Sequence, residues 1–313
     1  MGPGDGSWDQ GTVPRFPKSL VGNPRTVPPV PGFGKEKELK AKNAFVEFEY
    51  DEENTCPEIF ELNIVSGGCH IYGYLLAPDK RIEGPYPTVI MSHGFPGYTT
   101  NNDLELSLMR MGCVVIHMNH RGAWGSDGDY LFTNLKADLI SITKWAHNPA
   151  IADQYGIDAD NIFLVGHSMG GQTVLNAAKD LPFIKGVAAM AAYDIGAAFR
   201  YKMEKDLFLM IETEGQCLKM TSASDVFENA LINQQELSVL NRYEKLTEHN
   251  VLLVEATMDT ITPPDIMLKP LADMLKKAGA SISYRSIRSN HSFVGQRMKL
   301  AGIVGEWMEA VIK

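Results

Sequence analysis

The stretch at residues 162–178 constrains the fold more than any other part of the chain. It opens with Ile-Phe-Leu-Val, four apolar residues that favour a short buried strand. Gly-His-Ser-Met-Gly follows directly, and residues 172–178 have the composition of a helix. This order places Ser168 at the tip of a tight turn, where Gly166 and Gly170 let the strand and the helix approach each other. We interpret Ser168 as a nucleophile at the carboxyl edge of a sheet.

Strand patterns and helical patterns alternate along most of the chain. Expected strands lie at residues 44–50, 59–65, 70–76, 88–91, 113–118, 186–190, 251–256 and 281–287, and expected helices at 101–111, 135–147 and 265–278, with residues 294–312 closing the chain. Residues 59–65 and 70–76 flank Ser-Gly-Gly-Cys, which predicts a hairpin. We therefore expect an α/β fold with a mostly parallel central sheet, helices on both faces and an antiparallel edge.

Residues 195–247 interrupt this alternation, because they contain no buried-strand pattern. Helices are expected at 197–211 and 225–246. An insertion between two core strands lies at the carboxyl edge of the sheet, so we interpret this one as a small helical cap over Ser168. A helix pair packed on the core is the alternative.

The cap sequence holds candidate substrate-binding residues. Phe208 and Met210 are candidates for an apolar pocket, because Met-rich surfaces adapt to acyl chains and aromatic rings. Glu204, Glu212 and Glu214 could bind a peptide amine, but we expect them on a solvated helix face.

A serine nucleophile needs a base and an acid that orients the base. His291 follows the last expected strand, and Asp259 follows the strand before it. The chain order Ser168, Asp259, His291 is the order of an α/β-hydrolase triad. Asp194, which follows the strand at 186–190, is the alternative acid.

Backbone N–H groups near Ser168 are expected to bind the oxyanion that forms during acyl transfer. Met169 N–H lies at the positive, N-terminal end of the expected helix. Phe95 N–H is the second candidate donor, because it follows Gly94 in the loop after the strand at 88–91.

Five further residues near this edge have interpretations of their own. His93 is expected to hydrogen-bond its loop rather than act as a base, and His167 to pack under the turn that carries the serine. Arg121, in a glycine-rich loop, is expected to brace neighbouring loops. Trp124 and Tyr130 are candidate pocket residues.

Composition limits the partners of the chain. Its 313 residues carry a formal charge of −9 and no run of Lys or Arg, which argues against a nucleic-acid surface. The sequence contains no run of about 18 apolar residues, which a membrane-spanning helix would require. The N-terminus lacks the apolar core of a signal peptide, so we expect a cytoplasmic protein, although a signal peptide removed earlier would leave no trace. The scattered cysteines are expected to be reduced thiols, and we expect no metal and no cofactor.

The first residues differ in composition from the rest. Residues 1–34 contain seven Pro and seven Gly and few apolar anchors, so they cannot form a core of their own. We interpret them as an N-terminal arm, which packs either on its own domain or on a second subunit in a homo-oligomer. Residues 35–313 are interpreted as the catalytic domain, with the cap inserted at about 195–247.

These motifs together resemble the α/β-hydrolase superfamily over about residues 45–313. The resemblance rests on His-Gly-Phe-Pro-Gly, Asn-His-Arg-Gly-Ala-Trp-Gly-Ser, Gly-His-Ser-Met-Gly-Gly, Asp259 and His291. Within the superfamily, the chain resembles prolyl-oligopeptidase-like catalytic domains, dienelactone-hydrolase-like proteins and feruloyl (cinnamoyl) esterases. It departs from the large oligopeptidases, in which a β-propeller accompanies the catalytic domain.

We therefore expect a serine hydrolase that cleaves short-acyl or hydroxycinnamoyl esters of small molecules through an acyl-enzyme on Ser168. A small serine aminopeptidase or acyl-peptide hydrolase is the alternative within enzymes. A catalytically silent α/β-hydrolase that serves as a ligand receptor is the alternative outside them, but a complete triad argues against it.

Overall fold

The computed structural model describes residues 39–46, 57–98 and 101–313. The N-terminal arm at residues 1–34, Cys56 and residues 47–50 of the first expected strand lie outside these ranges. The described residues belong to one compact unit, which contains the sheet and the candidate site.

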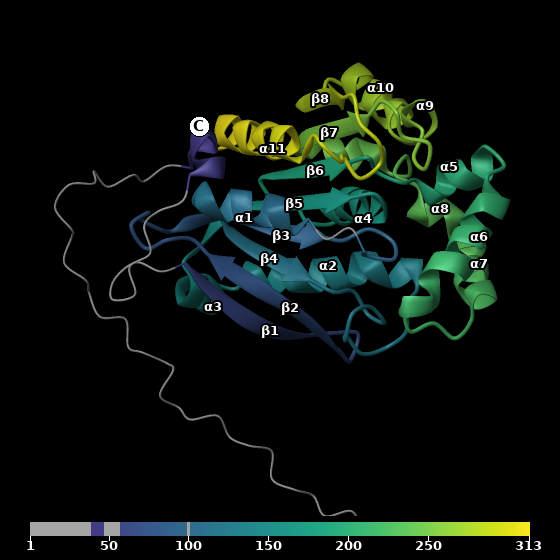
Figure 1. The fold of residues 1–313 in the computed structure, drawn as a ribbon, viewed down its shortest axis with the longest axis horizontal. Helices are drawn as coiled ribbons and strands as arrows, with labels where there is room; N and C mark the ends of the chain where they lie inside the picture. The colour runs from purple at the N-terminus through teal and green to yellow at the C-terminus, as the bar shows by residue number, and fades with distance from the viewer. Residues whose placement is uncertain (1–38, 47–56, 99–100) are drawn as a thin grey trace, which may run out of the picture. The chain divides into compact units, whose positions relative to one another are not determined.

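The described residues build one eight-stranded sheet, in the order β1-β2-β4-β3-β5-β6-β7-β8 (Figure 1). The strands are β1 (Glu58–Ser66), β2 (Cys69–Ala77), β3 (Tyr86–Ser92), β4 (Val114–Met118), β5 (Ile157–His167), β6 (Gly186–Met190), β7 (Asn250–Ala256) and β8 (Ile282–Ile287). β2 runs antiparallel to both β1 and β4, whereas all pairs from β4 to β8 are parallel. The expected α/β-hydrolase architecture with its antiparallel edge is confirmed.

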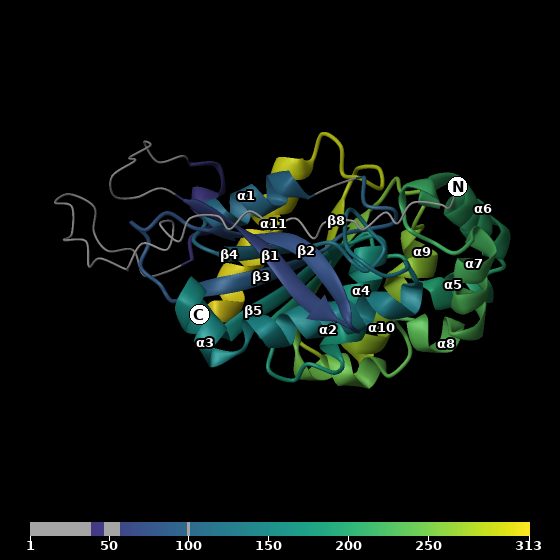
Figure 2. The same cartoon turned by 90° about the horizontal axis from the view of Figure 1, so that it is seen from below.

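Helices cover both faces of this sheet (Figures 1 and 2). They are α1 (Asn102–Arg110), α2 (Phe132–Ala146), α3 (Pro149–Tyr155), α4 (Met169–Ala178), α9 (Pro264–Met267), α10 (Lys269–Lys277) and α11 (Arg297–Ile312). α2, α3, α4 and α10 pack on one face around buried residues such as Leu139, Val174 and Leu271. α1 and α11 pack on the other, around Leu104, Leu108 and Val304. β4 and β6 are buried along their whole length, as parallel strands between two helical layers must be.

The hairpin at the sheet edge forms as expected. Ser66 pairs with Cys69, so that Gly67 and Gly68 make a two-residue turn between β1 and β2. Both glycines have positive φ, 56° and 78°, which a tight hairpin turn requires and side chains disfavour.

Two expected elements are wrong. Ala44 and Phe45 belong to the short 3₁₀ helix η2 (Ala41–Phe45) rather than to a strand. Ala44 is fully buried in the cluster formed with α1 and α11, and Ala41 N–H donates to a Glu309 carboxylate oxygen, so this segment docks on helices instead of joining the sheet. The single helix expected at 265–278 is divided into α9 and α10, because Pro270 cannot donate the hydrogen bond that would continue α9.

The insertion between β6 and β7 is divided into more and shorter helices than expected. It comprises α5 (Ile195–Arg200), α6 (Glu204–Glu214), η3 (Gly215–Cys217), α7 (Ala223–Ile232), α8 (Gln234–Leu237) and η4 (Tyr243–Glu248). Lys202, with a φ of 59°, ends the first expected helix early, and Arg242, with a φ of 55°, interrupts the second. Figures 1 and 2 both show α5–α8 gathered at one end of the catalytic domain.

The insertion has a small core of its own. Leu207, Ile211, Val226 and Ala230 pack there with Tyr130 and other residues of the main body.

Among the described residues, no helix is long and apolar enough to cross a membrane. Among the described cysteines, Cys69, Cys113 and Cys217 are free.

Candidate active site

Ser168 stands at a sharp turn between β5 and α4. Its φ of 58° and ψ of −122° are rare for a residue with a side chain, and such backbone strain concentrates at functional sites. The flanking glycines are required, because a Cβ on Gly166 would lie 2.2 Å from Gly170 O and one on Gly170 would lie 2.0 Å from Ser92 O. The turn therefore forces the serine side chain outward, and Ser168 lines a pocket.

His291 and Asp259 form a hydrogen-bonded pair beside this serine. His291 follows β8 and Asp259 follows β7, so the carboxyl ends of parallel strands bring them to the edge that carries Ser168. His291 Nδ1 lies 2.7 Å from Asp259 Oδ2. Because an ionised carboxylate only accepts hydrogen bonds, Nδ1 holds the proton and Nε2 keeps a free lone pair. The imidazole is thus in the tautomer that a general base needs.

The surroundings of Asp259 keep its carboxylate ionised. Oδ1 accepts hydrogen bonds from Ile261 N–H at 2.8 Å and Thr262 N–H at 2.9 Å, and Oδ2 accepts one from the Thr262 hydroxyl. Burial works to raise the pKa of Asp259, but the hydrogen bond and charge of His291 and the donors of Thr262 outweigh it and hold the pKa below its usual range.

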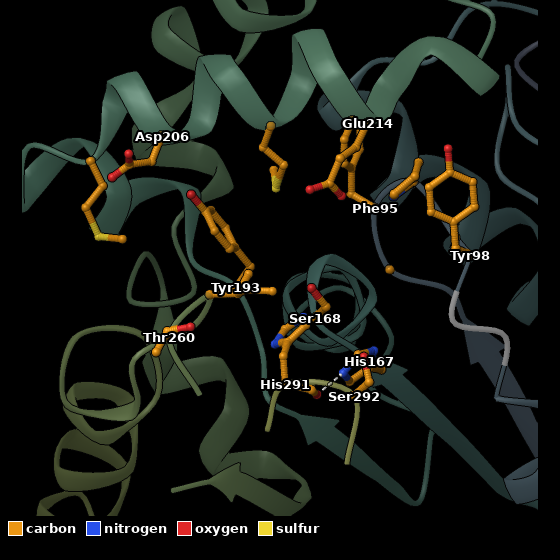
Figure 3. A pocket seen from close by; sticks show the side chains of 16 residues that line it. Phe95, Tyr98, His167, Ser168, Tyr193, Asp206, Glu214, Thr260, His291 and Ser292 are labelled. Atoms are coloured by element: carbon orange, nitrogen blue, oxygen red, sulfur yellow. Dashed lines mark hydrogen bonds between the residues drawn. The ribbon is translucent and has the colours of Figure 1, made fainter. Parts of the chain in front are cut away.

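His167 holds the loop that carries His291. Its Nε2–H donates to the His291 carbonyl oxygen at 2.8 Å, and the two rings pack with centroids 4.7 Å apart (Figure 3). Burial, followed by the charge of His291, lowers the pKa of His167 to about 3, so the ring is neutral at physiological pH. His167 packs under the turn as expected, and it also fixes the backbone of His291.

The loop after β3 lies directly against the serine. A Cβ on Gly94 would stand 3.2 Å from Ser168 Cβ and 3.7 Å from Ser168 Oγ. His93 Nε2 accepts the His120 backbone N–H at 3.3 Å, so Nδ1 is protonated and donates to Gly94 O at 2.7 Å. In a trans peptide the carbonyl and the next N–H point in opposite directions, so Phe95 N–H points away from His93. The expected role of His93 in its loop is confirmed.

The structure places the other expected donor, Met169 N–H, at the first position of α4. The N–H groups of a first turn have no partner within the helix and point along its positive end. Together with the Phe95 amide, this group is available to a negatively charged oxygen near Ser168.

Arg121 braces loops, as expected. Its Nε donates to Asp138 Oδ1 at 2.6 Å, and its backbone N–H donates to Asp138 Oδ2 at 3.0 Å. Ser66 Oγ donates to the same carboxylate at 2.8 Å. This buried contact ties the glycine-rich loop after β4 to α2 and to the hairpin.

Asp194 has different partners from Asp259. Its Oδ1 accepts hydrogen bonds from Gly196 N–H at 3.0 Å and from Val239 N–H at 3.2 Å, and its Oδ2 accepts one from Ser238 Oγ at 3.3 Å. It therefore caps α5 and secures the end of the cap. The structure pairs His291 with Asp259 and uses Asp194 elsewhere.

Ser168 and His291 line a pocket of about 380 Å³ beneath α6 (Figure 3). The lining residues are Gly94, Phe95, Pro96, Gly97, Tyr98, His167, Ser168, Tyr193, Met203, Asp206, Met210, Glu214, Thr260, Ile261, His291 and Ser292. The cap thus supplies one wall, through a single face of α6, and the loops after β3, β6, β7 and β8 supply the others.

Of the four expected pocket residues, only Met210 lines this pocket. Trp124 Nε1 donates to Pro96 O at 2.9 Å, so its ring supports the loop after β3 from outside. Tyr130 is buried behind Phe95, with ring centroids 5.6 Å apart. Phe208 packs against Phe227 inside the cap. These three residues do not line this pocket, because α6 and the β3 loop turn other side chains inward.

Sequence reasoning also missed residues that line the pocket. Glu214, expected on a solvated face, borders the pocket, as does Asp206. Met203, Asp206, Met210 and Glu214 are spaced by three, four and four residues, which marks one face of a helix. That spacing could have revealed the inward face of α6. No comparable spacing pattern in the sequence indicated that Tyr193 would line the pocket.

The fold and the position of the serine define the class of the protein, an α/β-hydrolase-fold serine hydrolase. Residues 100–311 match the model of the prolyl oligopeptidase family. The chain belongs to that family. No curated protein matches it at the level of sequence.

Solved structures share the fold at low sequence identity. Est1E from Butyrivibrio proteoclasticus, with ferulic acid bound, aligns with a TM-score of 0.60 and 17% identity over 80% of this chain and 99% of Est1E. Dipeptidyl peptidase 4 from Porphyromonas gingivalis aligns with a TM-score of 0.59 and 17% identity over 82% of this chain, which spans only 35% of that peptidase. A Mycobacterium tuberculosis puromycin-hydrolyzing peptidase aligns with a TM-score of 0.59 and 17% identity. The alignment covers 82% of this chain and 39% of that peptidase.

Proposed function

We propose that the protein hydrolyses carboxylic esters through an acyl-enzyme on Ser168. The observation that carries the proposal is the 2.7 Å contact between His291 Nδ1 and Asp259, which leaves His291 Nε2 to act as a base in the pocket that Ser168 also lines. A general base in the correct tautomer beside a strained, outward serine is the arrangement that nucleophilic acyl transfer needs.

The proposed reaction proceeds in two halves. His291 Nε2 takes the proton of Ser168 Oγ as the oxygen attacks the acyl carbon, and the imidazolium then protonates the departing alcohol. Asp259 stabilises that imidazolium. Water, activated by the same His291, attacks the acyl-enzyme and releases the acid.

The carbonyl oxygen becomes negatively charged in both halves. We assign its stabilisation to the N–H groups of Phe95 and Met169, because both belong to segments that flank Ser168. His93 supports this role, since its hydrogen bond to Gly94 O turns the following amide away from His93.

Ester substrates are favoured by the chemistry of the leaving group and by the walls of the pocket. An alcohol leaves more readily than an amine, so an ester demands less of the general acid. Phe95, Met203, Met210 and Ile261 offer apolar surface to an acyl chain or an aromatic ring. Short-acyl and hydroxycinnamoyl esters are the substrates we propose.

A second candidate is a small serine peptidase that cleaves aminoacyl amides. It is favoured by the carboxylates of Asp206 and Glu214, which border the pocket and could bind a free amino group. The proteins from Porphyromonas gingivalis and Mycobacterium tuberculosis that share the fold are peptidases, although the matching domain is a minor part of each chain.

A panel of p-nitrophenyl and hydroxycinnamoyl methyl esters, tested beside aminoacyl anilides, distinguishes the two. We expect kcat/KM for the best ester to exceed that for the best anilide by at least about 100-fold, or about 2.7 kcal/mol in transition-state binding. Comparable values would assign the protein to the peptidases.

The same purified protein tests the nucleophile. A fluorophosphonate probe should label wild-type protein at Ser168, and Ser168→Ala should lose the label and about 10⁶-fold in kcat. Wild-type protein that does not react would support a receptor without catalytic activity. A Ser168→Ala variant with a tenth of the activity would contradict the assignment of the nucleophile.

A further inference from the structure

One face of α6 forms the part of the pocket wall opposite Ser168. Figure 3 shows Glu214 pointing from this helix into the space above Ser168, and Asp206 further along the same helix on the side of the Tyr193 hydroxyl. They lie eight residues apart, with Met210 midway between them, so that both carboxylates and the thioether share one face. Eight residues of α-helix span about 12 Å, so a small charged group pairs closely with one of the two carboxylates while the other adds to the negative potential of the pocket.

The charge of this pocket is one-sided. Asp206 and Glu214 are acidic, and no Lys or Arg is among the described residues that line it. Within the described part of the chain, neither carboxylate makes a salt bridge. His167 adds no positive charge, since burial lowers its pKa to about 3. The pocket therefore attracts cations and repels anions.

A tyrosine in the wall offers a hydrogen-bonding group to a ligand in this pocket. Tyr193 is 4% exposed and lines the pocket, and its hydroxyl in Figure 3 points towards Asp206. Its backbone N–H donates to Ser168 O at 3.0 Å, but its hydroxyl makes no hydrogen bond to any of the described residues. The hydroxyl is not among the buried unpaired polar atoms of the described residues, so it faces the pocket, where a bound substrate can exchange a hydrogen bond with it.

The Tyr193 hydroxyl lies in a region of negative charge. Burial first, and then the negative charges of Asp206 and Asp194, raise the pKa of its hydroxyl. The hydroxyl therefore remains protonated, and a positive group placed beside Asp206 would relieve the excess of negative charge.

Aromatic rings complete the surroundings. Phe95, Tyr98 and Tyr193 line the pocket together with the two carboxylates. Aromatic faces attract ammonium groups through their π electrons, and quaternary ammonium groups are commonly bound by several such rings.

We propose that the pocket selects substrates that carry an ammonium group, which the carboxylate of Asp206 or of Glu214 attracts while Ser168 attacks the acyl carbon. The inference rests on the proposed acyl transfer at Ser168, but it holds for either an ester or an amide. Among the short-acyl esters proposed above, it favours those that carry a cationic group, and it makes Asp206 and Glu214 the residues that determine this preference.

Two pairs of esters, matched in shape and differing in charge, test this proposal. The first pair carries the charge on the acyl group: p-nitrophenyl 4-(trimethylammonio)butanoate is compared with p-nitrophenyl 5,5-dimethylhexanoate. The second carries it on the alcohol: butyrylcholine is compared with 3,3-dimethylbutyl butyrate. In at least one pair we expect kcat/KM for the cationic ester to exceed that of its neutral partner by about 10-fold. The pair that shows the preference identifies the side of the scissile bond that lies under α6.

Isosteric variants connect the preference to the two carboxylates. Asp206→Asn combined with Glu214→Gln should reduce the ratio of cationic to neutral kcat/KM to within about twofold. Glu212→Gln is the matched control, because it removes one charge from the exposed face of the same helix and should leave the ratio unchanged. The wild-type ratio should also fall between about 0.01 M and 0.5 M NaCl, since salt screens exposed charges.

The possible results separate this inference from the proposed function. Hydrolysis of both members of each pair at equal rates would overturn the cation preference and leave the esterase intact. A preference that the double variant retains would overturn the assignment to Asp206 and Glu214. If no ester is cleaved and Ser168 takes no fluorophosphonate label, the proposed function itself fails.

Discussion

Asp259 and Asp194 are both buried carboxylates that follow parallel strands, and their hydrogen bonds separate their roles. Asp259 is 6% exposed and contacts the His291 ring, whereas Asp194 is 1% exposed and contacts backbone N–H groups and Ser238 of the cap. The raised pKa of Asp194, caused mainly by burial, contrasts with the lowered pKa of Asp259. Position after a strand therefore does not identify the acid, but its partners do.

Asp259→Asn should reduce kcat by about 10⁴-fold, because an amide in place of the carboxylate favours the wrong tautomer of His291. Asp194→Asn serves as the comparison and should keep kcat within about tenfold while lowering the free energy of unfolding. Steady-state kinetics and urea denaturation of both variants measure these effects. A larger loss of kcat in Asp194→Asn would assign the acid to the earlier strand.

The residues of the proposed triad were predictable, whereas most of the pocket was not. Ser168, Asp259 and His291 follow strands whose carboxyl ends must lie at one edge, so chain order alone brings them together. Tyr193 and Asp206 depend on how the cap turns after β6 and on the rotation of α6 about its axis. Those features arise from tertiary packing, which a pattern of apolar residues does not specify.

At the scale of elements, the central strands were predictable as short apolar runs, and most covering helices were predictable from their amphipathic period. The cap was not, because Lys202 and Arg242 adopt positive φ at the ends of helices where the sequence offers no glycine. Such breaks depend on contacts made elsewhere. One of these contacts joins the cap to the C-terminal end of α4.

Lys179, which follows α4, secures the returning segment of the cap. Its Nζ donates to Asn176 Oδ1 at 2.7 Å, to Val239 O at 3.0 Å and to Asn241 O at 2.6 Å, and the residue is only 8% exposed. Lys179→Met should therefore lower the free energy of unfolding by about 3 kcal/mol, since it leaves buried carbonyl groups without a donor. Urea denaturation monitored by tryptophan fluorescence measures this cost.

Lys245→Met provides the comparison for that variant. Lys245 pairs with Glu248 at 3.0 Å, but both side chains are about half exposed, so its loss should change the free energy of unfolding by no more than about 0.5 kcal/mol. Equal costs for the two substitutions would show that the contacts of Lys179 do not secure the cap.

At the scale of the whole molecule, two buried neutral histidines connect the loops around the site to the pH dependence of stability. His93 is 4% exposed and His167 is 2% exposed, and each donates a hydrogen bond to a carbonyl oxygen of a loop that borders Ser168. Burial is the largest cause that lowers the pKa of each ring from 6.5 to about 3. Folding therefore keeps both rings neutral at a pH where the unfolded chain would protonate them.

The direction of the resulting effect follows from proton binding. Between about pH 6.5 and pH 3 the unfolded chain binds a proton at each histidine and the folded chain does not, so the free energy of unfolding falls as the pH falls. At pH 5.5 this amounts to about 1.4 kcal/mol per histidine relative to pH 7.5. His167→Gln keeps an N–H donor but removes the titrating group. The substitution should therefore lower the free energy of unfolding by about 1.4 kcal/mol less at pH 5.5 than at pH 7.5. Urea denaturation of both proteins at the two pH values measures this difference. A cost that is the same at both pH values would mean that His167 is protonated in the folded protein, and His167 would then not be the neutral donor that holds His291.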